Sequence, residues 1–358
     1  MKKSLVALAV LAASGAAMAQ SSVTLWGVAD AGYQSAKQGN VTKNIVSSSG
    51  LSSSQLGFRG TEDLGGGMNA SFWLEAGLTV DNGTSGGVAF QRRSTVELSG
   101  KAGAIRVGRD YTPSFWTHTV FDPFGTLGSG AGSNITGRGQ NATTGARTNN
   151  GISYLYGFNP NSTSNVGKGG LYVQATMALG EQLSTAAAQT GKYNGYRVGY
   201  SDAKMNIAIA TAEVVNGALK DKEMNIGASY DLGVARVMVK TGTNTLRTAN
   251  AGSGLVPGVA AAEYKWSSIG AAIPMAGGTI PISWNTSKNN VDSKEANQLA
   301  IGYVHNLSKR TAVYGTYSKI TNKNGATYGF NGGNGGFGSG LAPTGNGTGL
   351  DLGVRHAF

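Results

Sequence analysis

The chain has 358 residues, with 29 lysines and arginines against 18 acidic residues, 57 glycines, 7 prolines and no cysteine. This composition fits neither a collagen nor a disordered polymer, and the absence of cysteine excludes a scaffold held by disulfides. A large core or a closed hydrogen-bonded architecture must therefore hold the chain together.

Residues 1–19 have the features of a secretory signal peptide. Two lysines follow the first methionine, residues 5–13 form an apolar run, and a small-residue cleavage signature ends at Ala19. The alternative is a membrane-anchoring helix, but the run is much shorter than the ~20 apolar residues that a spanning helix needs. We therefore expect a cleaved leader, a mature chain that begins at Gln20, and one domain over residues 20–358.

Apolar and polar residues then alternate with a period of two, which indicates β-strands. The first strands are expected at 22–33, 55–61 and 68–78, followed by two around Val96 and Val107. Further strands are expected at 147–157, 170–180, 193–201, 204–215, 223–231, 234–243, 261–273, 278–288, 296–305, 310–321 and 348–358. The total is about sixteen.

The connections between these strands alternate between short turns and longer pieces. This alternation is typical of an outer-membrane barrel, which has short turns at one rim and long loops at the other. Residues 36–52 and 110–147 belong to the long set, while residues 157–169 are too long for the short set in which they fall. A soluble β-sandwich rarely has this many strands, and the final strand, which ends at Phe358, is suited to closing against the first. We predict an all-β fold, an antiparallel transmembrane barrel.

Residues 110–147 are too long and irregular for an ordinary connection. Their first half is rich in large apolar side chains, namely Tyr111, Phe115, Trp116, Phe121, Pro123 and Phe124. A free linker rarely carries so many aromatic residues. We predict that this segment folds into the lumen, is anchored there by these six residues, and narrows the pore as a constriction loop.

Charged residues of the expected lumen suggest a preference for anions. Arg59, Arg93 and Arg106 have inward parity and are expected on three successive wall strands, and Arg138 and Arg147 lie in or beside the long segment. The acidic side of the constriction is expected to be Asp110 and Asp122. The alternative for each arginine is a structural pair with a wall carboxylate such as Glu62, Glu75 or Glu97. Arg92 and Arg109 have outward parity and are expected at the rim, in a bulge or at a subunit contact.

The chain resembles the general porins of the β-proteobacterial outer membrane. The resemblance rests on SVTLWGVADAGY at 22–33, QLGFRGTEDLGGGMNASFWLE at 55–75, VGRDYTP at 107–113 and LGVRHAF at 352–358. It implies a homotrimer of sixteen-stranded channels, a third extracellular loop that forms the constriction, and a terminal aromatic, Phe358, that signals to the outer-membrane assembly machinery. Many members have Pro-Glu-Phe-Gly in that loop. Here Asp122 precedes the proline instead, which shifts the carboxylate.

Taken together, these patterns predict a passive diffusion channel for small hydrophilic solutes and ions. Its expected surroundings are outer-membrane lipid and lipopolysaccharide, and we expect no cofactor, metal or nucleic-acid partner. An outer-membrane enzyme is a rival interpretation, for which His118 is the single candidate base. A channel specific for one anionic solute and a purely structural or adhesive barrel are the other two.

Overall fold

The computed structural model describes residues 22–83, 88–136, 145–158, 167–181, 190–216, 219–246, 262–290, 293–330 and 345–358. The expected leader and Arg138 lie outside these residues. The described part contains seventeen strands that pair antiparallel and two short helices. None of these helices is both long and apolar enough to cross a membrane.

The first half of the sheet contains strands β1 Ser22–Gln38, β2 Val41–Ser48, β3 Gln55–Gly65, β4 Met68–Gly77, β5 Arg93–Gly100, β6 Gly103–Tyr111, β7 Arg147–Tyr156 and β8 Gly170–Ala178. The second half contains β9 Thr190–Ser201, β10 Met205–Asn216, β11 Leu219–Asp231, β12 Arg236–Leu246, β13 Ala262–Met275, β14 Gly278–Asn289, β15 Glu295–Asn306, β16 Thr311–Lys323 and β17 Gly347–Ala357. The helices are α2, Pro113–Val120, and the short 3₁₀ helix η2, Gly132–Asn134.

The sheet closes because β1 pairs with β17 on one side and with both β2 and β3 on the other. Ser22–Val28 of β1 pairs with β3, and Ala31–Gln38 pairs with β2. Strands β2 and β3 thus share one place in the wall beside β1, and the seventeen strands make a sixteen-stranded barrel. The closed all-β fold predicted from the sequence is confirmed.

The expectation of a long loop over 36–52 is wrong. The chain turns at Gly39, which has a φ of +56°, and returns as β2. Too few of the outward-facing residues of β2 are apolar for the alternation to reveal the strand from the sequence. The wall is then interrupted before β3, where the carboxylate of Asp30 accepts the backbone N–H groups of Leu51 and Ser52 at 2.9 and 2.6 Å. Arg355 lies opposite Asp30 in the register, but the carboxylate is engaged by these backbone groups instead.

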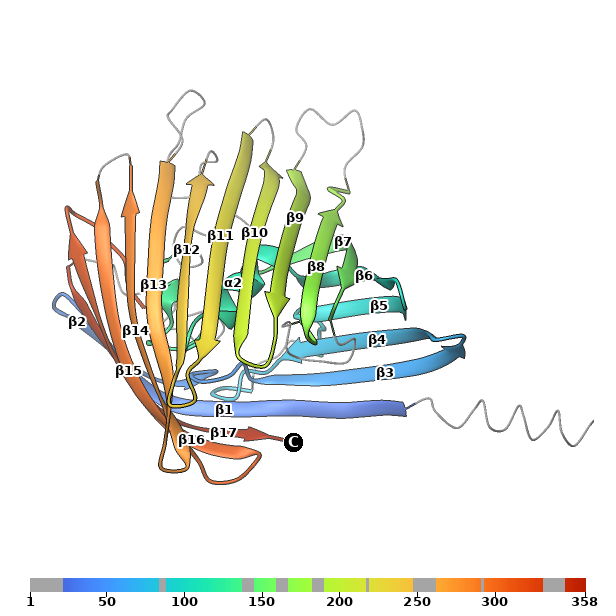
Figure 1. Ribbon diagram of the computed structural model, residues 1–358. Helices are drawn as coiled ribbons and strands as arrows, with labels where there is room; N and C mark the ends of the chain where they lie inside the picture. Colours follow the sequence, from blue (N-terminus) through green and yellow to red (C-terminus); the bar gives the residue numbers. More distant parts are fainter. Residues whose placement is uncertain are drawn as a thin grey trace, which may run out of the picture.

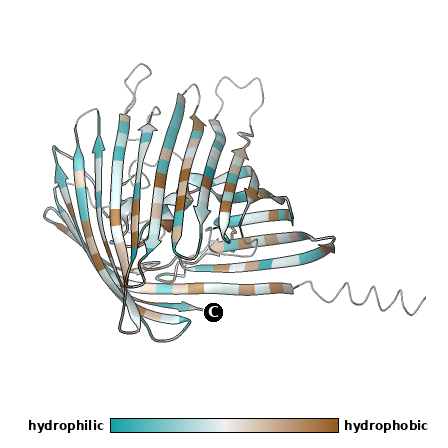
Figure 2. Cartoon of the chain, viewed as in Figure 1, coloured by the Kyte–Doolittle hydropathy of each residue, from teal (hydrophilic) through white to brown (hydrophobic). Residues whose placement is uncertain are grey.

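Apolar and polar residues alternate along the strands (Figure 2), and their exposure shows that the barrel is apolar outside and polar inside. On β5, Val96 and Leu98 are exposed on the outer face, whereas Thr95 and Glu97 between them are buried toward the interior. The same contrast recurs along the other strands, as the period of two requires. A wall of this kind presents its apolar side chains to lipid.

The segment between β6 and β7 enters the barrel. Helix α2 lies inside the wall (Figure 1) and packs against β8, β9, β10 and β11. Farther along the same segment, η2 contacts β14. The long loop therefore crosses the lumen, as predicted for residues 110–147, although Asp110 and Tyr111 still belong to β6.

Candidate functional site

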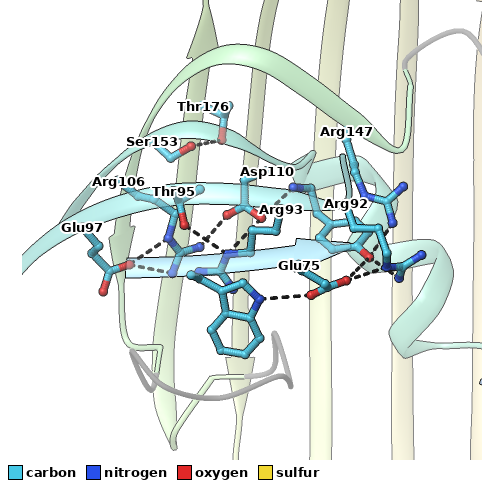
Figure 3. Close-up of polar contacts among 12 residues, drawn as sticks. Glu75, Arg92, Arg93, Thr95, Glu97, Arg106, Asp110, Arg147, Ser153 and Thr176 are labelled. Atoms are coloured by element: carbon cyan, nitrogen blue, oxygen red, sulfur yellow. Dashed lines mark hydrogen bonds and ion pairs between the residues drawn. The ribbon is translucent and has the colours of Figure 1, made fainter. Parts of the chain in front are cut away.

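Five arginines gather on the inner face of the barrel. They are Arg59 on β3, Arg92 just before β5, Arg93 on β5, Arg106 on β6 and Arg147 at the start of β7, and we call them the arginine cluster. Three carboxylates are interleaved with them, namely Glu75, Glu97 and Asp110 (Figure 3). The alternation of the strands places these side chains together because each occupies an inward position or adjoins one.

Arg106 and Arg93 share the carboxylate of Asp110. Arg106 Nη1 lies 2.7 Å from Asp110 Oδ2, and Arg93 Nε lies 3.5 Å from Oδ1. Arg106 also binds Glu97, with Nη2 at 2.6 Å from Oε2. Asp110 is thus the buried centre of the cluster. It binds two wall arginines and lies on β6. It is therefore part of the same wall as these arginines, whereas it was expected across the constriction from them.

Strand β4 contributes an aromatic ring to the cluster. The guanidinium carbon of Arg93 is 4.5 Å from the centre of the Trp73 ring and that of Arg59 is 5.3 Å away, distances typical of cation–π contacts. Trp73 also donates its Nε1–H to Glu75 at 3.1 Å. Because β4 lies between β3 and β5, the three predicted arginines are not on successive strands, and Trp73 fills the gap.

Tyr111 joins Arg92 and Arg147 at the point where β6 leads into the loop. Both guanidinium groups donate to its hydroxyl, at 2.7 and 2.6 Å, and Arg147 stacks on its ring. Arg92 also pairs with Glu75 at 2.6 Å and is buried. The outward parity assumed for Arg92 does not apply, because this residue precedes the first residue of β5, but the alternative of a structural pair with a wall carboxylate is what the structure shows. Arg109 does keep the outward parity and bonds to Asn149 and the carbonyl of Gln91.

Asp122 lies away from the arginine cluster. Its carboxylate pairs with Lys240 on β12 at 2.7 Å, and both side chains are fully buried. It also accepts the N–H groups of Phe124 and Gly132 at 2.9 and 3.0 Å. Lys240 in turn donates to the carbonyl of His118 at 2.9 Å. The predicted role of Asp122 as an acid facing the arginines is therefore wrong, because the carboxylate ties the loop to another part of the wall.

His118, which lies on α2 of the inserted loop, is also buried. Its Nε2 lies 2.7 Å from Glu223 Oε1 with both side chains at 0% exposure, and its ring lies against Trp266. A general base must reach the proton that it abstracts. A histidine enclosed in this way lacks that access. Within the part of the chain that the structure describes, no group of three or more acidic or histidine side chains is arranged to hold a metal.

The six large apolar residues of the loop make two groups of contacts. Tyr111, Phe115 and Trp116 pack on one another, with ring centres 4.7–5.6 Å apart; the rings of Tyr111 and Phe115 are stacked, and Trp116 is inclined to both. Phe121 is fully buried against Tyr172 of β8. Pro123 and Phe124 lie close to wall glycines, Gly270 and Gly302, where an added Cβ would meet them at 2.6 and 3.2 Å. Glycine at these positions lets the loop approach the wall closely.

The far end of the described loop is bound to the last strands. Ser129 donates its backbone N–H to Asp351 on β17 at 2.7 Å and accepts from the Gln298 side chain of β15 at 2.8 Å. Ile135 is fully buried with Ile320 of β16 and Ala36 of β1. After α2, the loop is therefore bound along β12, β14, β15 and β17, on the side of the ring away from the arginine cluster.

A hollow of about 490 Å³ opens below the cluster toward the short turns. Its lining includes Arg106 and Glu97 as well as Lys101 and Lys168, which lie outside the strands. Three cations and one carboxylate thus border the space that leads from the cluster to the short-turn rim.

Several of these residues are absent from the sequence-based candidates. Lys240 and Glu223 have inward parity between outward residues, so the alternation contains a signal for both. The pattern does not reveal that Lys240 pairs with Asp122 and Glu223 with His118. These two partners lie in the inserted loop, where no regular alternation indicates which way a side chain points. Trp73 had the correct inward parity but no assigned role, whereas Glu75 was named as a possible structural partner of an arginine and pairs with Arg92.

Comparison with known proteins agrees with this architecture. The sequence model of a family described as Gram-negative porin matches residues 4–353. Outer membrane porin protein 32 of Delftia acidovorans is 38% identical over the full length of both chains, and an outer membrane porin protein of Bordetella pertussis is 28% identical, covering 89% of this chain and 94% of its own.

The solved structure of an anion-selective porin from Comamonas acidovorans superposes with a TM-score of 0.79. It is 32% identical, and the match covers 95% of this chain and all of that one. The OmpT outer membrane protein of Vibrio cholerae shares the fold alone, at 12% identity and a TM-score of 0.66. The resemblance seen in the sequence is confirmed, and the outer membrane is the location that it implies. The chain belongs to the Gram-negative porin family.

Proposed function

We propose that this porin is a passive diffusion channel for small hydrophilic solutes that prefers anions, and that its narrowest part lies between the arginine cluster and the inserted loop. The observation that carries the proposal is the composition of the cluster. Five guanidinium groups, two of them half-buried at Arg59 and Arg147, are interleaved with three carboxylates. The cluster therefore carries a net positive charge.

The charge surplus acts on permeating ions because the surroundings are only partly aqueous. Near low-dielectric walls each unit charge has a stronger effect than in bulk water, and charged rings of this kind set the selectivity of pores. Arg93 and Arg106 are buried and paired with wall carboxylates, whereas Arg59 and Arg147 are only half-buried, so we assign the main contact with passing anions to Arg59 and Arg147. The similarity to an anion-selective porin of Comamonas acidovorans supports the same sign of selectivity.

The proposal is tested by reversal potentials in a salt gradient across a planar bilayer that contains the purified protein. We expect the sign that corresponds to anion preference. A potential of the cation-selective sign would refute it. Flux that stays linear with solute concentration is expected for a general pore, whereas saturation at low concentration would favour the specific channel considered from the sequence.

We further propose that the protein has no catalytic activity. The one histidine considered as a base is enclosed between Glu223, Trp266 and the loop backbone. Esterase and protease assays of the purified protein test this, and hydrolysis that His118→Ala abolishes would contradict it.

A homotrimer is proposed from an asymmetry of the outer face. Exposed tyrosines follow the short-turn ends of strands from β7 to β15, as in an interfacial girdle; these are Tyr154, Tyr156, Tyr200, Tyr230 and Tyr303. On β3–β6 the exposed outer residues are aliphatic instead, such as Val96 and Ile105, and a hollow of about 270 Å³ lies beside Ala70 and Phe72. An apolar face without a girdle supports a subunit contact.

Export and assembly complete the proposal. Removal of residues 1–19 is tested by the N-terminal sequence of the protein isolated from outer membranes, where we expect Gln20.

Phe358 is half-exposed at the end of the chain, with its ring over Gly27 of β1. We propose that it is read by the assembly machinery before that contact forms. Deletion of Phe358 should then reduce the amount of barrel in the membrane, and an undiminished amount would refute this role.

A further inference from the structure

Helix α2 turns its polar side to the barrel wall and its aromatic side away from it. Ser114, Thr117 and His118 are buried on the side where the helix packs against β8–β11. Phe115 and Trp116, on the opposite side of the helix, are partly exposed inside the barrel. A helix at the surface of a soluble domain has the reverse arrangement, with its apolar stripe buried.

The polar side of α2 suits the wall, because the inner face of the barrel is itself polar. Asn225 of β11 donates to the carbonyl of Ser114 at 3.1 Å, and other polar groups of the helix also contact this strand. Packing on Tyr111 buries only part of Phe115 and Trp116, and small polar residues in their place would leave no apolar surface exposed. An aromatic surface inside a solute channel therefore points to contact with a passing solute.

Tyr111 connects this aromatic surface to a positive charge. The rings of Tyr111 and Phe115 are stacked with centres 5.0 Å apart, and the centre of the Trp116 ring lies 4.7 Å from that of Tyr111. The guanidinium carbon of Arg147 lies 4.2 Å from the centre of the same tyrosine ring. Because both contact Tyr111, Arg147 and the Phe115 ring are at most about 9 Å apart.

The charge of Arg147 has no carboxylate partner among the residues that the structure describes (Figure 3). Its guanidinium donates to the Tyr111 hydroxyl at 2.6 Å, and its Nε has no acceptor. Arg92 donates to the same hydroxyl, but it is also paired with Glu75. The half-buried Arg147 is therefore placed to bind a carboxylate that enters the narrow part of the pore.

A molecule that combines a ring with a carboxylate fits both features. Rings in contact have centres about 4.5–7 Å apart, and a carboxylate oxygen lies about 2.8 Å from the guanidinium nitrogen that it binds. Since Phe115 and Arg147 are at most about 9 Å apart, an acid with a short chain between its ring and its carboxylate can contact both. Ligand sites are commonly lined in this way, by aromatic side chains and a few placed polar groups.

We propose that the channel has a low-affinity subsite for aromatic carboxylates at this side of α2. The ring of the solute lies against Phe115 and Trp116, and its carboxylate binds Arg147. The subsite lies where β6 leads into the inserted loop, so a solute that crosses the narrow part of the pore meets it. The inference rests on the proposed channel function and adds a class of solute, aromatic acids, that charge alone does not distinguish from other anions.

The test compares three solutes on single channels of the full-length protein in a planar bilayer. They are 3-phenylpropanoate, 3-cyclohexylpropanoate, which has a saturated ring, and 3-phenylpropanamide, which has the aromatic ring without the charge. The measured quantity is the solute concentration that halves the potassium chloride current. We expect this concentration to be about fivefold lower for 3-phenylpropanoate than for either of the others, because only this solute satisfies both parts of the subsite.

Variants separate the contribution of the rings from that of the charge. Phe115→Leu combined with Trp116→Leu keeps apolar side chains but removes both rings, so block by 3-phenylpropanoate should weaken about fivefold. Arg147→Gln should weaken it to the level seen with 3-phenylpropanamide. Trp116→Phe keeps an aromatic ring and should preserve most of the block. Trp284→Leu removes an exposed ring from the outer face of β14 and, as the matched control, should behave like the wild type.

The proposal is overturned if the saturated acid or the amide blocks the wild type as strongly as 3-phenylpropanoate, or if the variant without both rings is blocked like the wild type. The comparison of solutes on the wild type decides the matter even if that variant does not fold. Ion preference is measured separately, from the reversal potential in potassium chloride without aromatic solute. An anion-selective channel that 3-phenylpropanoate does not block refutes the subsite alone, whereas a cation-selective sign refutes the ion preference.

Discussion

Lys240 and Asp122 form an ion pair of 2.7 Å that no solvent reaches, with the lysine on the barrel wall and the carboxylate in the inserted loop. This contact fixes the middle of the loop, because Asp122 also holds the N–H groups of Phe124 and Gly132. In the proposed channel, the position of the loop, and with it the width of the pore, therefore depends on a pair that no permeating ion touches.

Replacement of the wall lysine should release the loop. Lys240→Met leaves Asp122 buried without its partner, at a cost of about 3–5 kcal/mol, because the uncompensated charge loses its attraction and stays desolvated. We expect larger or noisier single-channel conductance. The double variant Lys240→Met, Asp122→Asn should restore the wild-type conductance, and Lys309→Met in an exposed turn serves as the control. A quiet channel of unchanged conductance in Lys240→Met would contradict this role.

The half-buried arginines should carry the ion preference. Arg59→Gln combined with Arg147→Gln removes two charges while leaving the pairs of Arg106 and Arg92 in place. We expect the anion-to-cation permeability ratio, measured from reversal potentials, to fall about twofold or more. Arg109→Gln, on the outer face, should leave the ratio unchanged. An unaltered ratio in the double variant would place the selectivity elsewhere in the pore.

The buried part of the cluster should govern stability more than selectivity. Arg106→Met removes the ion-pair partner of Glu97 and one of the two arginines that bind Asp110, and we expect the barrel to lose about 3–5 kcal/mol of unfolding free energy. Urea unfolding in lipid vesicles measures this loss. Adding Glu97→Gln to the variant should recover part of it, because one uncompensated carboxylate is then neutral. Equal stability of Arg106→Met and the wild type would show that water or another cation solvates the two carboxylates.

The girdle-free outer face should be the subunit contact. Ala70→Trp adds a large side chain beside the hollow on β3–β5, whereas Ile269→Trp adds one on the girdled wall. We expect size-exclusion chromatography with light scattering to report loss of the trimer only for Ala70→Trp. Trimers of normal size in both variants would move the contact to another part of the wall.

Most of the fold follows from local alternation, and it was predictable for that reason. Residues such as Val96 and Leu98 must face lipid, and Thr95 and Glu97 must not, so each strand shows its two faces in the sequence. Strand β2 was missed because its outer positions mix Val46 with polar side chains near the rim, where lipid no longer imposes apolar residues. The interruption between β2 and β3 is invisible locally, since it depends on Asp30.

The site was predictable only where strand parity governs it. Arg59, Arg93 and Arg106 were placed on the inner face from their own neighbours in sequence. The partner of Asp122 could not be placed, because Lys240 is 118 residues away and a loop without regular structure does not specify the direction of its side chains. Arg92 was misplaced for a related reason, since it precedes the regular part of β5.

The attachment of the loop at Asp351 determines the order in which the pore can be made. Gly128 lies so close to the backbone of Gly50 that a Cβ would meet its carbonyl at 2.4 Å, and Ser129 donates to Asp351 of the final strand. The surface that binds this part of the loop is thus formed by residues from the first and last parts of the chain. These parts lie side by side only after β17 has paired with β1. A nascent barrel that is still open at this seam lacks the docking surface, so constriction follows closure during biogenesis.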